Sequence, residues 1–236
     1  MKNICLMLCV SCLAAVAVGD ETAYEGQPIG SIAVTAPGRS AIVAVAFKEL
    51  SVSDEQVSAA NIVSTVNLQD GDELFIYSND SYDAWTLQNG AWTKVLKTNS
   101  EGTTEGPEAA AVRAKIGSGF WLMRNGENRD YAKPFYIFGA VVELVPTTAA
   151  AGAKTLMGNP CLTAKTPTIT GMSNGDTIQF ATGGGTFNTY TYNATKEQWG
   201  HWDENNSPVW GGVPEIPAGV GFWYVSKGGE VTFGWR

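Results

Sequence analysis

The sequence predicts an all-β protein made of two tandem, similar antiparallel units, each a small β-sandwich or barrel-like sheet. Three observations support this prediction. Short runs rich in β-branched and aromatic residues are separated by Gly, Asn, Asp and Pro, which form turns. A Gly-x-Gly-Phe-Trp motif occurs at 117–121 and again at 219–223. The start signals of a helix are clear in one segment only.

The chain begins with the features of a secretory signal. Lys2 precedes an apolar run over 4–18 that ends in small residues, so we expect a signal peptide at 1–17. The run is shorter than the roughly 20 residues of a membrane-spanning helix. We therefore expect a protein that is secreted, periplasmic or at the cell surface, with no membrane span after cleavage. Lipidation at Cys12 is the alternative.

Composition excludes several classes of partner and site. With 15 basic and 23 acidic residues the net charge is −8, which disfavours nucleic acid and anionic lipid surfaces. After signal cleavage Cys161 is the one remaining cysteine, which rules out an internal disulfide and a cysteine-based zinc site. We expect no cofactor and no metal.

The first unit, over 18–146, has strand signals separated by turns and one helix signal. Ser53 followed by Gln56 resembles a capping box, so a short helix is predicted near 54–60. It should be short because β-branched residues follow at 62–63. The predicted strands of this unit are 31–37, 40–47, 72–78, 82–88 and 134–145.

The second unit, over 147–236, has strand signals of the same kind. In one of them Tyr190 and Tyr192 alternate with polar residues and share a face. If the last strand lies at a sheet edge, its backbone can pair with a neighbouring molecule. The predicted strands are 176–182, 186–193, 220–226 and 230–235.

The two units align over most of their length. A Gly-Asp pair before a strand occurs at 71–72 and 175–176, and Trp92 corresponds to Trp199. A single pseudo-symmetric sandwich shared by both halves is the alternative to two units. The repeated motif consists of Gly117, Gly119, Phe120 and Trp121 in the first unit, and of Gly219, Gly221, Phe222 and Trp223 in the second.

The motif itself is interpreted as structural. In a strand the Phe and the Trp point to opposite faces, so one ring can enter a core while the other covers the outer face. Glycine before an aromatic residue in a strand marks a bulge, a bend or a place where a ring needs room. A ligand-binding role for the motif is the alternative.

Candidate catalytic groups are few. His201 is the single histidine, beside Asp203, and the sequence has no Gly-x-Ser-x-Gly motif. The acidic and amide residues at 203–206 do not follow the ligand spacing of an EF-hand. Paired carboxylates of a hydrolase cannot be placed from sequence. The sequence therefore predicts a protein that is not an enzyme.

Aromatic residues give the best candidate for a binding site. Trp202 and Trp210 flank a polar stretch that includes His201, Asp203 and Asn205. Flat rings beside hydrogen-bonding side chains can bind a sugar or a partner protein. The alternative is that both rings cap the end of the sandwich.

The Gly-Asp pairs, the Trp-bearing hairpins and the Gly-x-Gly-Phe-Trp strands resemble those of uncharacterised, duplicated secreted β proteins of bacterial cell envelopes. The resemblance implies no catalytic residues. We expect a structural or adhesive role at the cell surface, through a protein partner or self-association. The alternatives are a carbohydrate-binding module that binds polysaccharide, or an unrecognised hydrolase.

Overall fold

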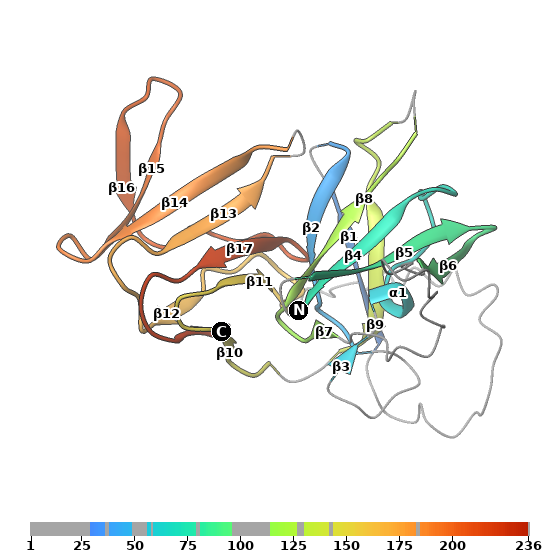
Figure 1. The fold of residues 1–236 in the computed structure, drawn as a ribbon, viewed down its shortest axis with the longest axis horizontal. Coiled ribbons are helices and arrows are strands. Elements are labelled where there is room, and N and C mark those ends of the chain that lie inside the picture. Colours follow the sequence, from blue (N-terminus) through green and yellow to red (C-terminus); the bar gives the residue numbers. More distant parts are fainter. Residues whose placement is uncertain are drawn as a thin grey trace, which may run out of the picture.

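In the computed structural model the two halves of the chain form two groups of strands that lie side by side (Figure 1). The predicted signal peptide lies outside the described residues. No helix in the described part of the chain is long and apolar enough to cross a membrane. The structure describes residues 29–35, 38–48, 56–57, 59–78, 81–95, 114–126, 130–141, 144–182 and 185–235.

The first unit consists of a five-stranded sheet that packs over a two-stranded sheet. The five strands lie in the order β2-β8-β4-β5-β6, and β1 pairs with β9 in the smaller sheet. A further short pair is formed by β3 and β7. The elements are β1 (Ile29–Val34), β2 (Ser40–Ala44), β3 (Gln56–Val57), α1 (Ala59–Ile62), β4 (Glu73–Ser78), β5 (Ser81–Gln88), β6 (Ala91–Lys94), β7 (Ala114–Lys115), β8 (Gly119–Met123) and β9 (Phe135–Ala140).

The second unit consists of a six-stranded sheet over a three-stranded sheet. The larger sheet has the order β11-β17-β13-β14-β15-β16, and the smaller one has the order β10-β18-β12. The elements are β10 (Thr147–Ala149), β11 (Lys154–Gly158), β12 (Thr168–Thr170), β13 (Thr177–Ala181), β14 (Phe187–Asn193), β15 (Gln198–Trp202), β16 (Pro208–Gly211), β17 (Gly221–Val225) and β18 (Val231–Gly234).

The larger sheets of the two units have the same strand order, and β16 extends the second one by a strand. All pairings within them are antiparallel. The prediction of an all-β, sandwich-like fold built from antiparallel sheets is thereby confirmed. Positions of the two units are called equivalent below when they occupy the same place in these registers.

Each unit has its own hydrophobic core between its two sheets. Phe120 and Phe222 are fully buried in the two cores, as the alternation of the motif predicts. Trp121 and Trp223 follow them directly and therefore point to the opposite face of each larger sheet. We call this opposite face the outer face.

The Gly-Asp pairs clamp the chain at the start of β4 and β13. Asp72 is fully buried, and its carboxylate accepts hydrogen bonds from the backbone N–H of Gln69 (2.9 Å) and of Asn125 (2.9 Å). Gln69 lies in the turn before β4, and Asn125 follows β8. The carboxylate therefore ties the turn to the neighbouring strand.

Asp176 makes the equivalent clamp in the second unit. It accepts hydrogen bonds from the backbone N–H of Ser173 (2.8 Å) and of Lys227 (2.6 Å). The hydroxyl of Tyr224 donates a third bond to it (2.6 Å). Both acids are structural in their described contacts, which explains why the Gly-Asp pair occurs before a strand in each unit.

The short helix of the first unit starts later than the capping box suggests. The described helix is Ala59–Ile62, whereas Gln56 and Val57 pair with β7 as a short strand. Ser53, the predicted capping residue, lies outside the described residues. Val63 ends the helix by forming a bridge with Ile137 of β9, so the β-branched residues limit the helix as expected.

The last strand does not lie at a sheet edge. β18 pairs with β10 on one side and with β12 on the other. Phe233 and Val231 of this strand point into the core of the second unit. Sequence position alone suggested a free edge, but the chain end is inserted between two earlier strands, so its backbone is not available to a neighbouring molecule.

The two units meet through the outer faces of their larger sheets. Ile42, Leu156 and Trp223 form a small buried cluster at this junction. The backbone N–H of Ala44 donates to the carbonyl of Gly219 (2.9 Å), and that of Gly158 donates to the carbonyl of Gly117 (2.8 Å). Ala44 and Gly158 are equivalent positions, as are Gly117 and Gly219, so the junction has an internal two-fold pattern.

The glycines of the motif make room for this junction. A Cβ at Gly117 would overlap Thr147 of the second unit, and a Cβ at Gly219 would lie 2.8 Å from Val34 of the first unit. A Cβ at Gly119 would lie 2.7 Å from the carbonyl oxygen of Met157. The sequence predicts that these glycines bend a strand or leave room for a ring, whereas in the structure they leave room for the backbone and side chains of the opposite unit.

Candidate functional site

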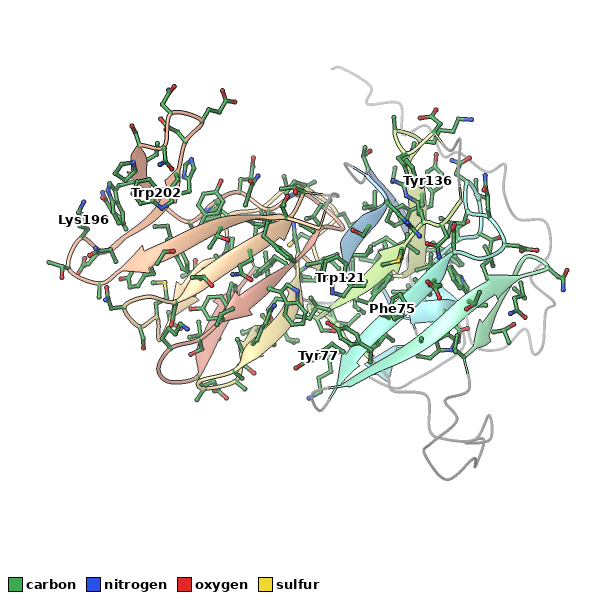
Figure 2. All side chains as sticks on the ribbon, turned by 45° about the horizontal axis from the view of Figure 1, so that its top comes forward. Phe75, Tyr77, Trp121, Tyr136, Lys196 and Trp202 are labelled. Atoms are coloured by element: carbon green, nitrogen blue, oxygen red, sulfur yellow. The ribbon has the colours of Figure 1, made fainter. Side chains whose placement is uncertain are left out.

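The residues predicted as a binding site lie on one hairpin, formed by β15 and β16, that extends from the end of the second unit (Figure 1). Trp202 marks this hairpin in Figure 2. β16 ends the six-stranded sheet, and all four of its residues are exposed. The hairpin therefore has an open edge and little cover.

The two tryptophans share one face of the hairpin. Trp202 pairs with Pro208, and Trp210 pairs with Gly200. Because side chains alternate along each strand, these four residues lie on the outer face. Trp202 is 67% exposed and Trp210 is 36% exposed. The structure therefore places on one face the two rings that lie on either side of a loop in the sequence.

Only one of the two rings is open to a large extent. The indole of Trp210 lies against the strand, because a Cβ at Gly200 would lie 2.6 Å from one of its ring carbons. The ammonium of Lys196 lies 4.0 Å from the centre of the same ring, which is a cation–π contact. Trp210 is thus anchored by its own unit, and Trp202 is the ring that a partner can reach.

His201 lies on the other face of the hairpin. Its ring is 4.8 Å from that of Tyr190, at an angle of 46°. Tyr190 in turn makes an edge contact with Phe180, at 6.0 Å between ring centres. His201 therefore belongs to the aromatic packing of the inner face, and the structure does not bring it to the tryptophan pair.

Asp203 and Asn205 form the turn of the hairpin. The carboxylate of Asp203 accepts hydrogen bonds from the backbone N–H of Asn205 (2.9 Å) and of Ser207 (2.7 Å). This oxygen is used to hold the turn, and it is less available to a ligand. The side chain of Asn205 is exposed at the tip.

A second aromatic group, which the sequence did not point to, lies where the two units meet. Figure 2 shows Phe75, Tyr77 and Trp121 in this region. The rings contact one another within and between the units. We call this group the junction aromatic cluster; it comprises Phe75, Tyr77, Tyr82, Trp121, Phe187 and Trp223.

The sequence contains one signal of this cluster. Leu74 and Ile76 of β4 are buried in the core, so Phe75 and Tyr77 must lie on the outer face. A strand with large apolar side chains on both faces indicates that both faces are covered or used. What the outer face meets depends on the packing of two units that are far apart in the sequence.

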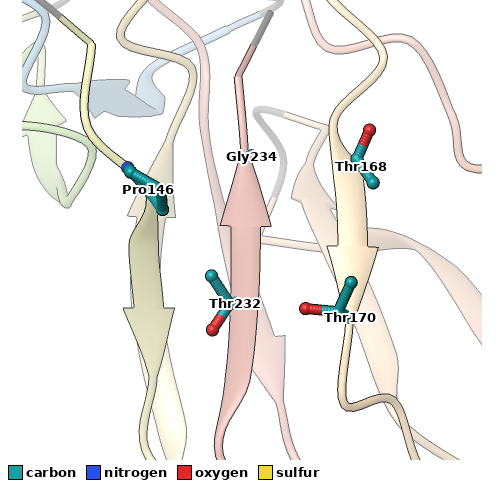
Figure 3. Close-up of a pocket in the computed structure, with 5 residues that line it drawn as sticks. All are labelled: Pro146, Thr168, Thr170, Thr232 and Gly234. Carbon is teal, nitrogen blue, oxygen red and sulfur yellow. The ribbon is translucent and has the colours of Figure 1, made fainter.

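The small sheet of the second unit has a shallow concave surface of about 280 Å³ (Figure 3). Its lining is uncharged and carries hydroxyl groups as its polar side chains. Thr170 and Thr232 are neighbours across two paired strands. Such a surface can hydrogen-bond weakly but offers no acid, base or nucleophile activated by a neighbour. The lining residues are Pro146, Thr168, Thr170, Thr232 and Gly234.

Within the described residues, no three His, Cys, Asp or Glu side chains lie together so that they could hold a metal ion. Cys161 is a buried free thiol, and burial raises its pKa.

Comparison with known proteins found no match. No family model fits the chain, and no characterised protein or solved structure is significantly similar to it.

Proposed function

We propose that the chain is a non-enzymatic, secreted protein of the cell surface that acts in adhesion by binding a protein partner through the β15–β16 hairpin. The observation that carries this proposal is Trp202, a large apolar ring that is 67% exposed on a projecting hairpin. Tryptophan is enriched among the residues that dominate the energy of protein interfaces. Exposing such a ring to water is unfavourable unless a partner covers it.

The edge of β16 adds a second means of contact. Among the described residues its backbone pairs with β15 on one side and with no strand on the other. The backbone groups of alternate residues face this open side, and Pro208 has no N–H to offer there. An extended segment of a partner can add to such an edge, and the neighbouring rings can select its side chains.

Carbohydrate binding is the second candidate, favoured by the shared face of Trp202 and Trp210. Sugar rings stack on flat aromatic surfaces, and adjacent polar groups hydrogen-bond to their hydroxyls. Two facts make this candidate weaker. The ring of Trp210 is partly covered by Lys196, and the carboxylate of Asp203 already accepts two bonds in the turn.

Binding of the labelled chain to intact cells of the organism that encodes it tests the proposal. Cells would be untreated, treated with protease, or treated with periodate to oxidise surface sugars. We expect binding that is lost after protease and retained after periodate. Trp202→Ala should weaken it at least about tenfold, as expected for a residue that dominates an interface.

Val209→Ala is the matched control, because Val209 is exposed on the same hairpin but on the opposite face. It should bind as the unsubstituted chain does. Binding that is lost after periodate and retained after protease would replace the proposal by carbohydrate recognition. Absence of cell binding, or equal binding by Trp202→Ala, would reject the hairpin as an adhesive site.

A further inference from the structure

The two tryptophans of the repeated motif occupy equivalent positions but have different surroundings. Trp121 pairs with Ile42 of β2 and with Phe75 of β4. Trp223 pairs with Leu156 and Gln179 in the same way. Trp223 is only 3% exposed, whereas Trp121 is half-buried. The ring of Trp223 is therefore covered by neighbouring groups to a greater extent than the ring of Trp121.

The cover of Trp223 consists of a cation and an aromatic ring. The ammonium of Lys154 lies 4.3 Å from the centre of the Trp223 ring, which places it for a cation–π contact. The ring of Tyr77, which belongs to the first unit, meets Trp223 edge-on at 5.2 Å and 82°. The side chain of Lys154 is exposed as a whole, and partial loss of hydration lowers its pKa below the usual value.

At Trp121 both covering residues are replaced by short ones. Ser40 is equivalent to Lys154, because both begin the strand that pairs with the motif strand. Leu74 of β4 and Ile178 of β13 occupy matching places in the two registers. Tyr77 lies three positions after Leu74, and Ala181 lies three positions after Ile178, so these two residues are equivalent. Serine carries no charge and alanine carries no ring. Among the described residues Trp121 therefore has no counterpart of the Lys154 ammonium, and the ring that meets it edge-on is Phe187 of the second unit instead.

Three other aromatic rings surround Trp121 at the surface. Phe187 of the second unit meets it edge-on at 6.2 Å, and the ammonium of Lys154 lies 5.9 Å from the centre of the Phe187 ring, so this cation reaches the border of the group but not Trp121 itself. Tyr82 forms a side-chain hydrogen bond with it and packs edge-on against Phe75 at 6.3 Å. Phe187 and Tyr82 are each 36% exposed. Aromatic rings that are clustered and partly exposed at a surface can bind an ammonium group against their faces, as aromatic cages do.

We propose that Trp121, with Phe75, Tyr82 and Phe187, binds a lysine or arginine side chain of a partner protein. Lys154 shows the geometry in the equivalent copy, where the chain supplies its own cation. The net charge of −8 attracts a cationic partner and favours its approach. The inference rests on the proposed role in protein binding, but it uses a different surface from the hairpin.

NMR titration of the full mature chain with an acetylated tetralysine peptide tests the proposal. The indole N–H signal of Trp121 is identified by its loss in Trp121→Phe. We expect this signal to shift in a saturable manner with tetralysine and not with tetraserine. Ser40→Lys should supply an internal ammonium like Lys154 and weaken peptide binding about fivefold, while the ring stays in place.

Trp202→Ala separates this site from the hairpin. It should leave the tetralysine titration unchanged even where it abolishes binding to cells. An unmoved Trp121 signal, an equal response to tetraserine, or an unchanged affinity in Ser40→Lys would each overturn the proposal. A response of Trp121 that disappears in Trp202→Ala would also overturn it, because the two surfaces would then not be independent.

Discussion

Tyr224 distinguishes the two Gly-Asp clamps at the level of a single residue. Its hydroxyl donates to the carboxylate of Asp176, and the equivalent position in the first unit is Leu122. Burial raises the pKa of Tyr224, and the hydrogen bond to Asp176 and the charge of that carboxylate raise it further. The folded chain therefore keeps a proton that the unfolded chain loses above its ordinary pKa of about 10.

This pKa shift predicts a loss of stability in alkali. The contribution of Tyr224 is complete below about pH 10 and decreases as the pH rises further, by up to about 1.4 kcal/mol per pH unit. Tyr224→Phe removes the titrating group. The difference in free energy of unfolding between the two proteins should therefore shrink between about pH 9 and about pH 11. Urea titrations at each pH measure it.

Other lysines and tyrosines titrate in both proteins, and their effect cancels in the difference. A difference that stays constant over this range would show that Tyr224 ionises equally in the folded and unfolded chains. This result would contradict the conclusion that folding raises the pKa of Tyr224.

At the scale of the element, removal of the carboxylate that holds the turn before β4 or β13 should lower stability most clearly. Asp176→Ala leaves the backbone N–H groups of Ser173 and Lys227 without their acceptor. Because Asp176 is fully buried, water cannot replace the carboxylate. We expect the free energy of unfolding to fall by about 2–3 kcal/mol, measured by chemical denaturation.

Asp203→Ala is the matched control for this prediction. Asp203 also accepts two backbone hydrogen bonds in a turn, but it is partly exposed to water. Its removal should lower the free energy of unfolding by less than about 1 kcal/mol. Equal losses in the two variants would contradict the role given to burial at the clamp.

About half of the described strands could be predicted from the sequence, because alternation and turn residues are local. β4, β5 and β13 agree closely with the predicted runs. The start of α1 was misplaced, because a capping box shows that a helix can begin and not that it does so there. The position of β18 between two strands could not be predicted, since pairing is decided by residues far apart in the chain.

The candidate hairpin was predicted in part. The tryptophans were identified by type, and their common face follows from the register of β15 and β16. The inward direction of His201 also follows from alternation once Trp199 is known to be in the core. The junction aromatic cluster was missed, because its rings come together only when the two units pack.

At the scale of the molecule, the junction between the units depends on residues without side chains. A Cβ at Gly158 would lie 2.5 Å from the backbone of Ala44. Gly158→Val should therefore separate the outer faces and lower the free energy of unfolding by about 1–3 kcal/mol. Denaturation monitored by tryptophan fluorescence should show this loss, because Trp223 lies at the junction.

Gly211→Val provides the comparison, because a Cβ at Gly211 would meet no atom within 4 Å. Its free energy of unfolding should stay within about 0.5 kcal/mol of that of the unsubstituted chain. If both valine variants were equally stable, the close approach at Gly158 would not matter for the association of the units.

The internal two-fold pattern makes the junction redundant. Each copy of the Gly-x-Gly-Phe-Trp motif provides one of two matching backbone hydrogen bonds between the units. A substitution in one copy should therefore weaken the junction while the matching contact of the other copy remains. The junction tolerates a change in one copy better than the same change in both.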